Sequence, residues 1–106
     1  MSRLGFDEKG FMRVHLYILK NQANKLFSKL GFTQQYINNN LVHTINGEYC
    51  KLTFISAFNG FVIETAENIT NATNNLYEDS DVISLENGTE TFFDDLEQTL
   101  RNYYLL

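Results

Sequence analysis

Two Asn-Gly pairs, each flanked by strand-forming residues, constrain the fold of this chain more than any other feature. They are Asn46-Gly47 and Asn59-Gly60, within the stretch LVHTINGEYCKLTFISAFNGFVIETAE. A two-residue hairpin turn requires positive φ at both central positions, and Asn followed by Gly is the favoured pair for it. The sequence therefore predicts a three-stranded antiparallel meander over about 41–45, 48–57 and 61–66.

The two turns also set the pairing of the predicted strands. The expected pairs are Ile45 with Glu48, His43 with Cys50, Leu41 with Leu52 and Phe58 with Phe61. Because side chains alternate along a strand, one face of the meander is expected to pack on helices. That face carries Leu41, His43, Ile45, Cys50, Leu52, Phe54, Phe61 and Ile63. The other face carries Thr44, Tyr49, Lys51 and Thr53, with Ile55 and Val62 partly covered.

A helix is predicted on the N-terminal side of the meander. Between Glu8 and Leu30, apolar residues recur at helical spacing, at Met12, Leu16, Leu19, Ala23, Leu26, Phe27 and Leu30. Asp7 can cap the start of this helix and Gly31 can end it. Within it, the stretch RVHLYI alternates between polar and apolar residues, so residues 11–19 could instead form a strand before a shorter helix. We favour the single helix.

A second helix is predicted at the C-terminus, in NGTETFFDDLEQTLRNYYLL. Asn87 can cap this helix, and Glu90 three residues later completes a capping-box pattern. The stripe expected to face the core is Phe92, Leu96, Leu100 and Tyr103, with Phe93 and Tyr104 at its border. Arg101 near the end and acids near the start also suit the helix dipole.

Between the meander and the last helix lie two weaker elements. The stretch NITNATNNLYE is a short helix or an irregular turn, and DVISLE (81–86) alternates as a possible fourth, edge strand. No repeat and no linker divides the chain. The predicted fold is therefore one α+β domain over residues 1–106, a small antiparallel sheet packed against N-terminal and C-terminal helices.

Charge is distributed unevenly along the chain. Residues 1–51 hold seven basic and three acidic residues, a balance of +4, and residues 52–106 hold one basic and ten acidic residues, a balance of −9. Nucleic-acid affinity depends mainly on cations that neutralise phosphates, so a protein of net charge −5 is a poor nucleic-acid binder. An acidic face attracts a basic protein and speeds its docking.

The sequence offers little for catalysis, metal binding or a cofactor. Its only imidazoles and thiol are His15, His43 and Cys50, and we expect His43 and Cys50 to be a core histidine and a buried thiol. No phosphate-binding loop, zinc motif or nucleophile elbow occurs. We therefore predict a non-enzymatic protein with no cofactor or metal. The single cysteine, and an N-terminus without a long apolar run, indicate a cytoplasmic location.

The segment Leu76–Leu100 carries eight acidic residues and no Lys or Arg. Helix electrostatics explains part of this charge, but not Glu78, Asp79 and Asp81, which precede a strand and repel one another. Like charges that cost stability suggest a partner of opposite charge, with a merely solvated charged surface as the alternative. The predicted partner-binding residues are Tyr77, Glu78, Asp79, Asp81, Glu86, Asp94, Asp95 and Glu97. Tyr103 and Tyr104 are further candidates for aromatic anchors, with core packing as the alternative.

From Gly60 onward, GFVIETAENITNATNNLYEDSDVISLENGTETFFDDLEQTLRNYYL resembles the C-terminal half of small immunity proteins from bacterial contact-dependent growth inhibition and related polymorphic toxin systems. The features that carry the resemblance are the strand GFVIETAE, the turn LYEDSDVISLE and the acidic amphipathic last helix. They form a pattern of layout and charge over roughly the last 50 residues, without a catalytic signature. No binding residue of the family can be assigned by position.

The resemblance implies a protein that binds and neutralises one cognate toxin domain in the cytoplasm of the producing cell. A nuclease is the expected toxin, because the phosphate-binding site of a nuclease is basic and an acidic surface complements it. An RNase is favoured over a DNase. Two other classes remain open. A phage-encoded mimic of nucleic acid would use the same acidity against a host DNA- or RNA-binding protein. A small enzyme would need a pocket near His43 and Cys50.

Overall fold

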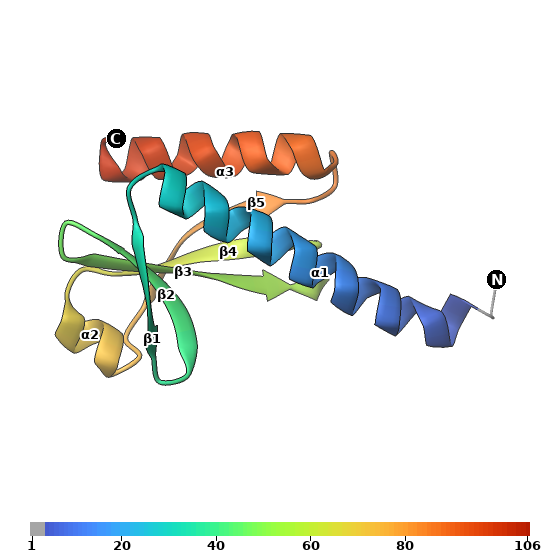
Figure 1. The fold of residues 1–106 in the computed structure, drawn as a ribbon, viewed down its shortest axis with the longest axis horizontal. Coiled ribbons are helices and arrows are strands. Elements are labelled where there is room, and N and C mark those ends of the chain that lie inside the picture. The colour runs from blue at the N-terminus through green and yellow to red at the C-terminus, as the bar shows by residue number, and fades with distance from the viewer. Residues whose placement is uncertain (1–3) are drawn as a thin grey trace.

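The computed structural model describes the backbone of residues 4–106 and the side chains from residue 15 onward. Three helices and five strands follow one another in the described chain (Figure 1). In chain order they are α1 (Leu4–Lys29), β1 (Thr33–Ile37), β2 (Asn40–Ile45), β3 (Glu48–Ile55), β4 (Gly60–Ala66), α2 (Ile69–Thr73), β5 (Glu78–Ser84) and α3 (Thr89–Tyr104). A single 3₁₀ turn, η1 (Ser56–Phe58), joins β3 to β4.

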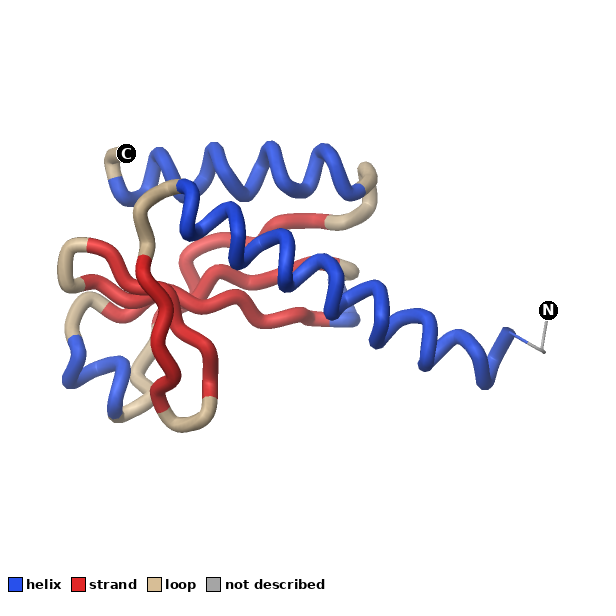
Figure 2. The backbone as a smooth tube through the Cα atoms, viewed as in Figure 1, coloured by secondary structure: helices blue, strands red, loops and turns tan. Residues whose placement is uncertain are grey.

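The five strands form one antiparallel sheet in the order β1-β2-β3-β4-β5. The two long helices pack against one face of this sheet, and their buried residues share a core with Cys50, Phe61 and Ile63. Figure 2 shows α1 and α3 on the same side of the strands, with α2 apart from them. The predicted α+β fold is confirmed, and the sheet has one strand more than the four we expected.

Helix α1 continues through residues 11–19, so the prediction of one helix there is correct. It begins at Leu4, which leaves Asp7 inside the helix rather than at its cap, and the side chain of Met12 lies outside the described residues. At the other end, Gly31 has φ +101°. The amide of Phe32 donates to the Phe27 carbonyl at 3.0 Å, and the Gly31 amide donates to Ser28 at 3.1 Å. This pair of bonds is the Schellman motif that a C-terminal glycine permits.

The first Asn-Gly turn forms as predicted, with positive φ at Asn46 (52°) and Gly47 (80°). The pairs His43–Cys50 and Ile45–Glu48 are confirmed. The ladder between β2 and β3 ends at His43–Cys50, so the predicted pair Leu41–Leu52 does not form, and Leu41 pairs only with Tyr36 of β1 on the other side of β2. The two strands therefore separate beyond His43, and Leu41 alone of the predicted packing face does not join or border the core.

The second Asn-Gly pair does not form a two-residue turn, and this prediction is wrong. Asn59 has positive φ (46°) at the end of η1, whereas Gly60 is the first residue of β4. Phe61 consequently pairs with Phe54 rather than with Phe58, a shift of four residues in register. Glycine is needed at position 60 for space: a Cβ there would lie 2.5 Å from the Ile83 carbonyl oxygen of β5.

Replacing Gly60 with alanine is therefore expected to push β5 away from β4 and to lower the free energy of unfolding by about 1–3 kcal/mol. Urea denaturation measures the loss. Gly47→Asn is the matched control, because nothing lies within 4 Å of a Cβ at Gly47 and asparagine tolerates positive φ. Equal stability of the two variants would contradict the close approach of β5 to Gly60.

Strand β1 has no counterpart in the sequence predictions. It joins β2 through a two-residue turn at Asn38 and Asn39, whose φ values are 53° and 66°. Asparagine is the non-glycine residue that most readily adopts this left-handed conformation. Among the described residues, asparagine adopts this conformation at five positions, Asn38, Asn39, Asn46, Asn59 and Asn75. The Asn-rich composition thus supplies turns where another protein would use glycine.

The last two elements differ from prediction at their boundaries. The edge strand runs over Glu78–Ser84 rather than 81–86. Helix α3 begins at Thr89 with Gly88 at its N-cap, so Asn87 does not cap it. The buried stripe of α3 advances in steps of four residues and consists of Phe92, Leu96, Leu100 and Tyr104. Tyr103, predicted to face the core, is 51% exposed, and Tyr104 takes the buried place.

Helix α2 covers part of the opposite face of the sheet. The Asn68 side chain caps it by accepting a hydrogen bond from the Asn71 amide at 2.8 Å. After α2, Asn75 accepts a hydrogen bond from the Lys51 ammonium at 3.3 Å, which ties this segment to β3. Val62, which we expected to be partly covered, is buried on this face at 6% exposed.

Candidate functional site

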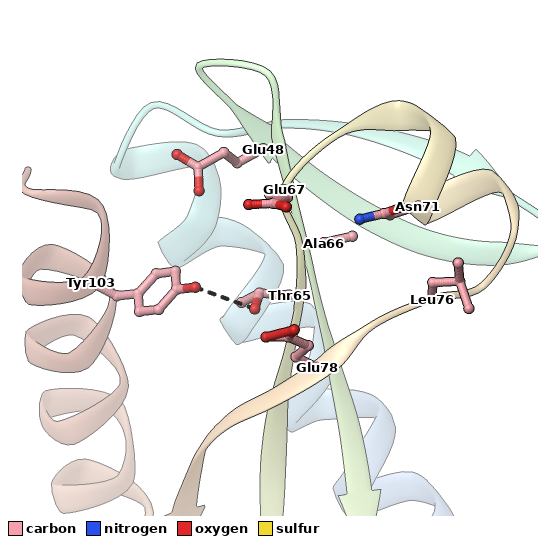
Figure 3. A pocket seen from close by; sticks show the side chains of 8 residues that line it. All are labelled: Glu48, Thr65, Ala66, Glu67, Asn71, Leu76, Glu78 and Tyr103. Carbon is pink, nitrogen blue, oxygen red and sulfur yellow. Dashed lines mark hydrogen bonds between the residues drawn. The ribbon is translucent and has the colours of Figure 1, made fainter.

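A small hollow at one end of the sheet gathers carboxylates from three separate segments (Figure 3). We call it the acidic hollow. Its volume is about 110 Å³, and its lining is Glu48, Thr65, Ala66, Glu67, Asn71, Leu76, Glu78 and Tyr103. Glu48 begins β3, Glu67 follows the end of β4, and Glu78 begins β5. Their approach follows from the register, because Tyr49 pairs with Ala66 and Thr65 pairs with Glu78.

The floor of the acidic hollow is fixed by hydroxyl groups. Thr65 is 8% exposed, and its Oγ1 shares a hydrogen bond with the Ser80 hydroxyl at 2.7 Å. The same oxygen lies 3.3 Å from the Tyr103 hydroxyl, as the dashed line in Figure 3 marks. These contacts hold the end of α3 against β4 and β5. The half-exposed Tyr103 ring therefore stands at a defined place beside the carboxylates.

No basic side chain among the described residues lines the acidic hollow. Within the described residues, both ion pairs involve Glu97 instead, with Lys29 at 3.5 Å and Arg101 at 2.9 Å. In the same part of the chain, no three side chains of His, Cys, Asp or Glu are grouped so that they could hold a metal ion. The three carboxylates thus surround the hollow without converging on one point.

The predicted acids of β5 do not all point the same way. Glu78 pairs with Thr65 and lies in the acidic hollow, whereas Asp79 pairs with Glu64 on the opposite face of the sheet. Asp81 follows a bulge and pairs with Ile63. Its carboxylate accepts a hydrogen bond from the amide of the next residue at 3.1 Å. Of these three acids, Glu78 is the one that the fold brings together with other carboxylates.

The predicted acids of α3 are divided as well. Glu97 is engaged in its two ion pairs, and the hydrogen bond from Arg101 lowers the pKa of its carboxyl. Asp94 lies on the same side of the helix as Glu97 and Arg101. Asp95, Thr99 and Tyr103 are spaced by four residues and therefore lie on one face of α3. This face leads toward the acidic hollow at Tyr103. Glu86 is exposed in the loop before α3.

Tyr77, the predicted aromatic anchor, is half-buried and faces its own protein. The Lys51 ammonium lies 4.3 Å from the centre of the Tyr77 ring. Burial is the main reason that the pKa of Tyr77 is raised. Tyr103 is the more exposed ring beside the carboxylates, and Leu76 (59% exposed) is the apolar residue across the hollow from it.

Sequence reasoning missed two of the three acids of the hollow, Glu48 and Glu67. The signal was present in the hairpin register. With the observed pairs, Glu48 lies next to Tyr49 and Glu67 next to Ala66, so the two acids are neighbours across β3 and β4. The two-residue turn that we predicted at Asn59-Gly60 would have placed residue 71 there instead. One incorrect turn therefore concealed that these two acids are neighbours.

The pair His43 and Cys50 is buried, as we predicted. Both residues lie on the helical face of the sheet, at 3% and 0% exposed. Burial lowers the pKa of His43 to about 4. Burial also raises the pKa of the Cys50 thiol to about 12, with the Tyr104 hydroxyl opposing this rise and Glu64 adding to it. Both groups are therefore uncharged at neutral pH, and a thiolate nucleophile paired with imidazolium is not available here.

No family model matches the chain, and no curated protein or solved structure is significantly similar to it. Across the described helices, none has an apolar stretch of the length that a bilayer span requires. The chemistry of the acidic hollow is thus the main structural guide to function.

Proposed function

We propose that this protein is a bacterial immunity protein that binds a cognate basic toxin domain in the cytoplasm and neutralises it. The toxin is a nuclease in this proposal, with an RNase as the first choice. The sequence resemblance described above supplies the class of protein. The observation that carries the proposal is the acidic hollow, where Glu48, Glu67 and Glu78 meet without a cation in the lining.

The composition of the hollow suits a cationic protein surface. Three carboxylates attract Lys or Arg side chains, and the exposed faces of Tyr103 and Leu76 offer apolar contact beside them. Tight interfaces usually combine a buried aromatic or apolar anchor with charges that select and orient the partner. A basic phosphate-binding site on a nuclease presents the opposite charge. Its occupation by carboxylates would exclude the nucleic-acid substrate.

The test is direct binding to the product of the neighbouring toxin gene, measured by calorimetry at low and high salt. The variant Glu48→Gln/Glu67→Gln/Glu78→Gln is expected to bind about 10–100-fold more weakly, because the Lys or Arg groups of the toxin lose their charged partners. The affinity of the wild type is expected to fall as salt rises, and the variant is expected to show less of this dependence.

A second triple variant, Asp79→Asn/Glu86→Gln/Asp94→Asn, is the matched control. It removes the same number of charges from predicted acids outside the hollow, so general attraction at long range is reduced equally. Its affinity is expected to stay within a few-fold of the wild type. Equal losses from both triple variants would contradict the hollow as the docking site, and no binding by the wild type would contradict the proposed function.

A further inference from the structure

The two edges of the sheet are built differently. Edge strand β5 carries Glu78, Asp79 and Asp81 and has a bulge opposite Ile63 and Glu64. Charges and bulges are the usual devices that keep an edge strand from pairing with another chain. Strand β1 at the other edge has the sequence TQQYI, with no charge and no proline. Its five pairs with β2 are regular, and four of its five residues are exposed.

The register of β1 shows which of its backbone groups are available. The pair Ile37–Asn40 closes the two-residue turn, and a hairpin of this kind closes on a hydrogen-bonded pair. Hydrogen-bonded and non-bonded positions alternate from there, so the amides and carbonyls of Gln35 and Thr33 also point to β2. Those of Gln34 and Tyr36 point outward, away from the sheet. A strand that pairs with this edge must engage these two residues.

We propose that β1 is the interface for a second copy of this chain. The two β1 strands pair antiparallel about a two-fold axis at Gln35, so that Gln34 of each copy is hydrogen-bonded to Tyr36 of the other. This register matches outward groups with outward groups and uses all five residues of the strand. It joins two sheets into one of ten strands. The inference does not depend on the proposed function.

The surface beside β1 can accommodate the Tyr36 side chain of the second copy. Tyr36 is 75% exposed, so its ring is available for contact with a second chain. In the dimer its ring lies next to Gln34 of the other copy. Gln34 lines a shallow hollow of about 460 Å³ on α1, together with Asn21, Asn24, Lys25 and Ser28. The Gln34 amide already donates to the Asn24 carbonyl at 3.2 Å. Lys25 and the amide groups suit a phenol ring and its hydroxyl.

Charge and symmetry favour a second β1 as the occupant. Two β5 strands cannot pair easily, because their carboxylates would repel one another. Pairing of β1 with β5 of the next copy would leave a free edge at each end and would extend without limit. Pairing of β1 with β1 uses the same uncharged edge twice and closes as a dimer. The contact is short, so the dimer is expected to be weak.

The experiment is analytical ultracentrifugation over a range of concentrations up to about 1 mM, which covers weak pairing of this size. The wild type is expected to pass from monomer to dimer. Gln35→Glu and Gln35→Lys are each expected to remain monomeric, because Gln35 faces its own copy across the axis and like charges oppose one another. An equimolar mixture of the two variants is expected to recover the dimer.

Gln98→Glu, at an exposed position on α3, is the control for the added charge and is expected to dimerise as the wild type does. The melting temperature of each variant, measured at low concentration, verifies that the monomer is folded. A wild type that stays monomeric throughout overturns the inference. So does a dimer that survives in Gln35→Glu, or a mixture of the charged variants that remains monomeric, since either would place the contact elsewhere.

Discussion

The variant Phe27→Ala is expected to lose about 3–5 kcal/mol of unfolding free energy, the usual cost of removing a buried aromatic ring. Phe27 is fully buried where the end of α1 meets the sheet. Its ring is stacked on His43 with 3.7 Å between ring centres, and it meets the edge of Phe32 at 5.0 Å. The ring thus joins the helix, the strand β2 and the segment after the helix. Alanine would leave a cavity among all three.

Urea denaturation followed by circular dichroism measures the effect. Tyr17→Ala is the control, because Tyr17 is an aromatic residue of the same helix that is 67% exposed, and its loss is expected to cost less than about 1 kcal/mol. The helix end itself is retained in Phe27→Ala, since Phe32 bonds to the backbone carbonyl of residue 27. Similar losses for the two variants would mean that Phe27 is not the centre of this contact.

The parts of the fold that were predictable depend on local chemistry. Asn46-Gly47 satisfies a turn that needs two positive φ values, and Gly31 satisfies a Schellman motif. Each of these signals determines the backbone within a few positions of itself. The pairs His43–Cys50 and Ile45–Glu48 followed from the first turn alone.

The failures arose where a distant segment decides the local structure. Gly60 looked like a turn residue, but its lack of a side chain serves the approach of β5, more than twenty residues away. The choice between Tyr103 and Tyr104 likewise depends on distant residues, because Tyr104 packs against Phe32 after α1 whereas the half-exposed Tyr103 reaches Thr65 of β4. Strand β1 is nearly all polar, so it lacks the alternation that would reveal it.

The candidate site illustrates the same limit. The sequence showed an excess of carboxylates in the second half of the chain, but proximity in sequence did not select those that meet. Glu78 remained in the site, whereas Asp79 points to the other face and Glu97 is paired with Lys29 and Arg101. Glu48, from the basic half of the chain, joined through the β3–β4 register. The strand register, more than the composition, therefore decides which carboxylates share a surface patch.

His43 combines two features that make stability depend on pH. It is 3% exposed, and its Nδ1 atom has no hydrogen-bond partner among the described residues. Burial lowers the pKa of His43 from 6.5 to about 4, so the folded protein keeps it neutral where the unfolded chain would already bind a proton. The stability associated with neutral His43 is fully present above about pH 6.5 and is lost as the pH falls toward 4.

Replacing His43 with phenylalanine is therefore expected to remove a pH dependence of stability. A lowered pKa of this size corresponds to roughly 3 kcal/mol in total, of which about 2 kcal/mol is lost between about pH 7 and pH 5. Phenylalanine keeps the stack on Phe27 and leaves no polar atom unpaired, so the variant should be at least as stable as the wild type at about pH 5.

Urea denaturation at a series of pH values between about 7 and 5 distinguishes the two proteins, because carboxylates contribute mainly below this range. His15→Phe, which removes the other histidine of the chain, separates the share of the slope that belongs to His43. Parallel loss of stability in the wild type and His43→Phe would show that another group controls the response. A flat profile in His43→Phe alone would identify the buried imidazole as the group that limits the acid stability of the fold.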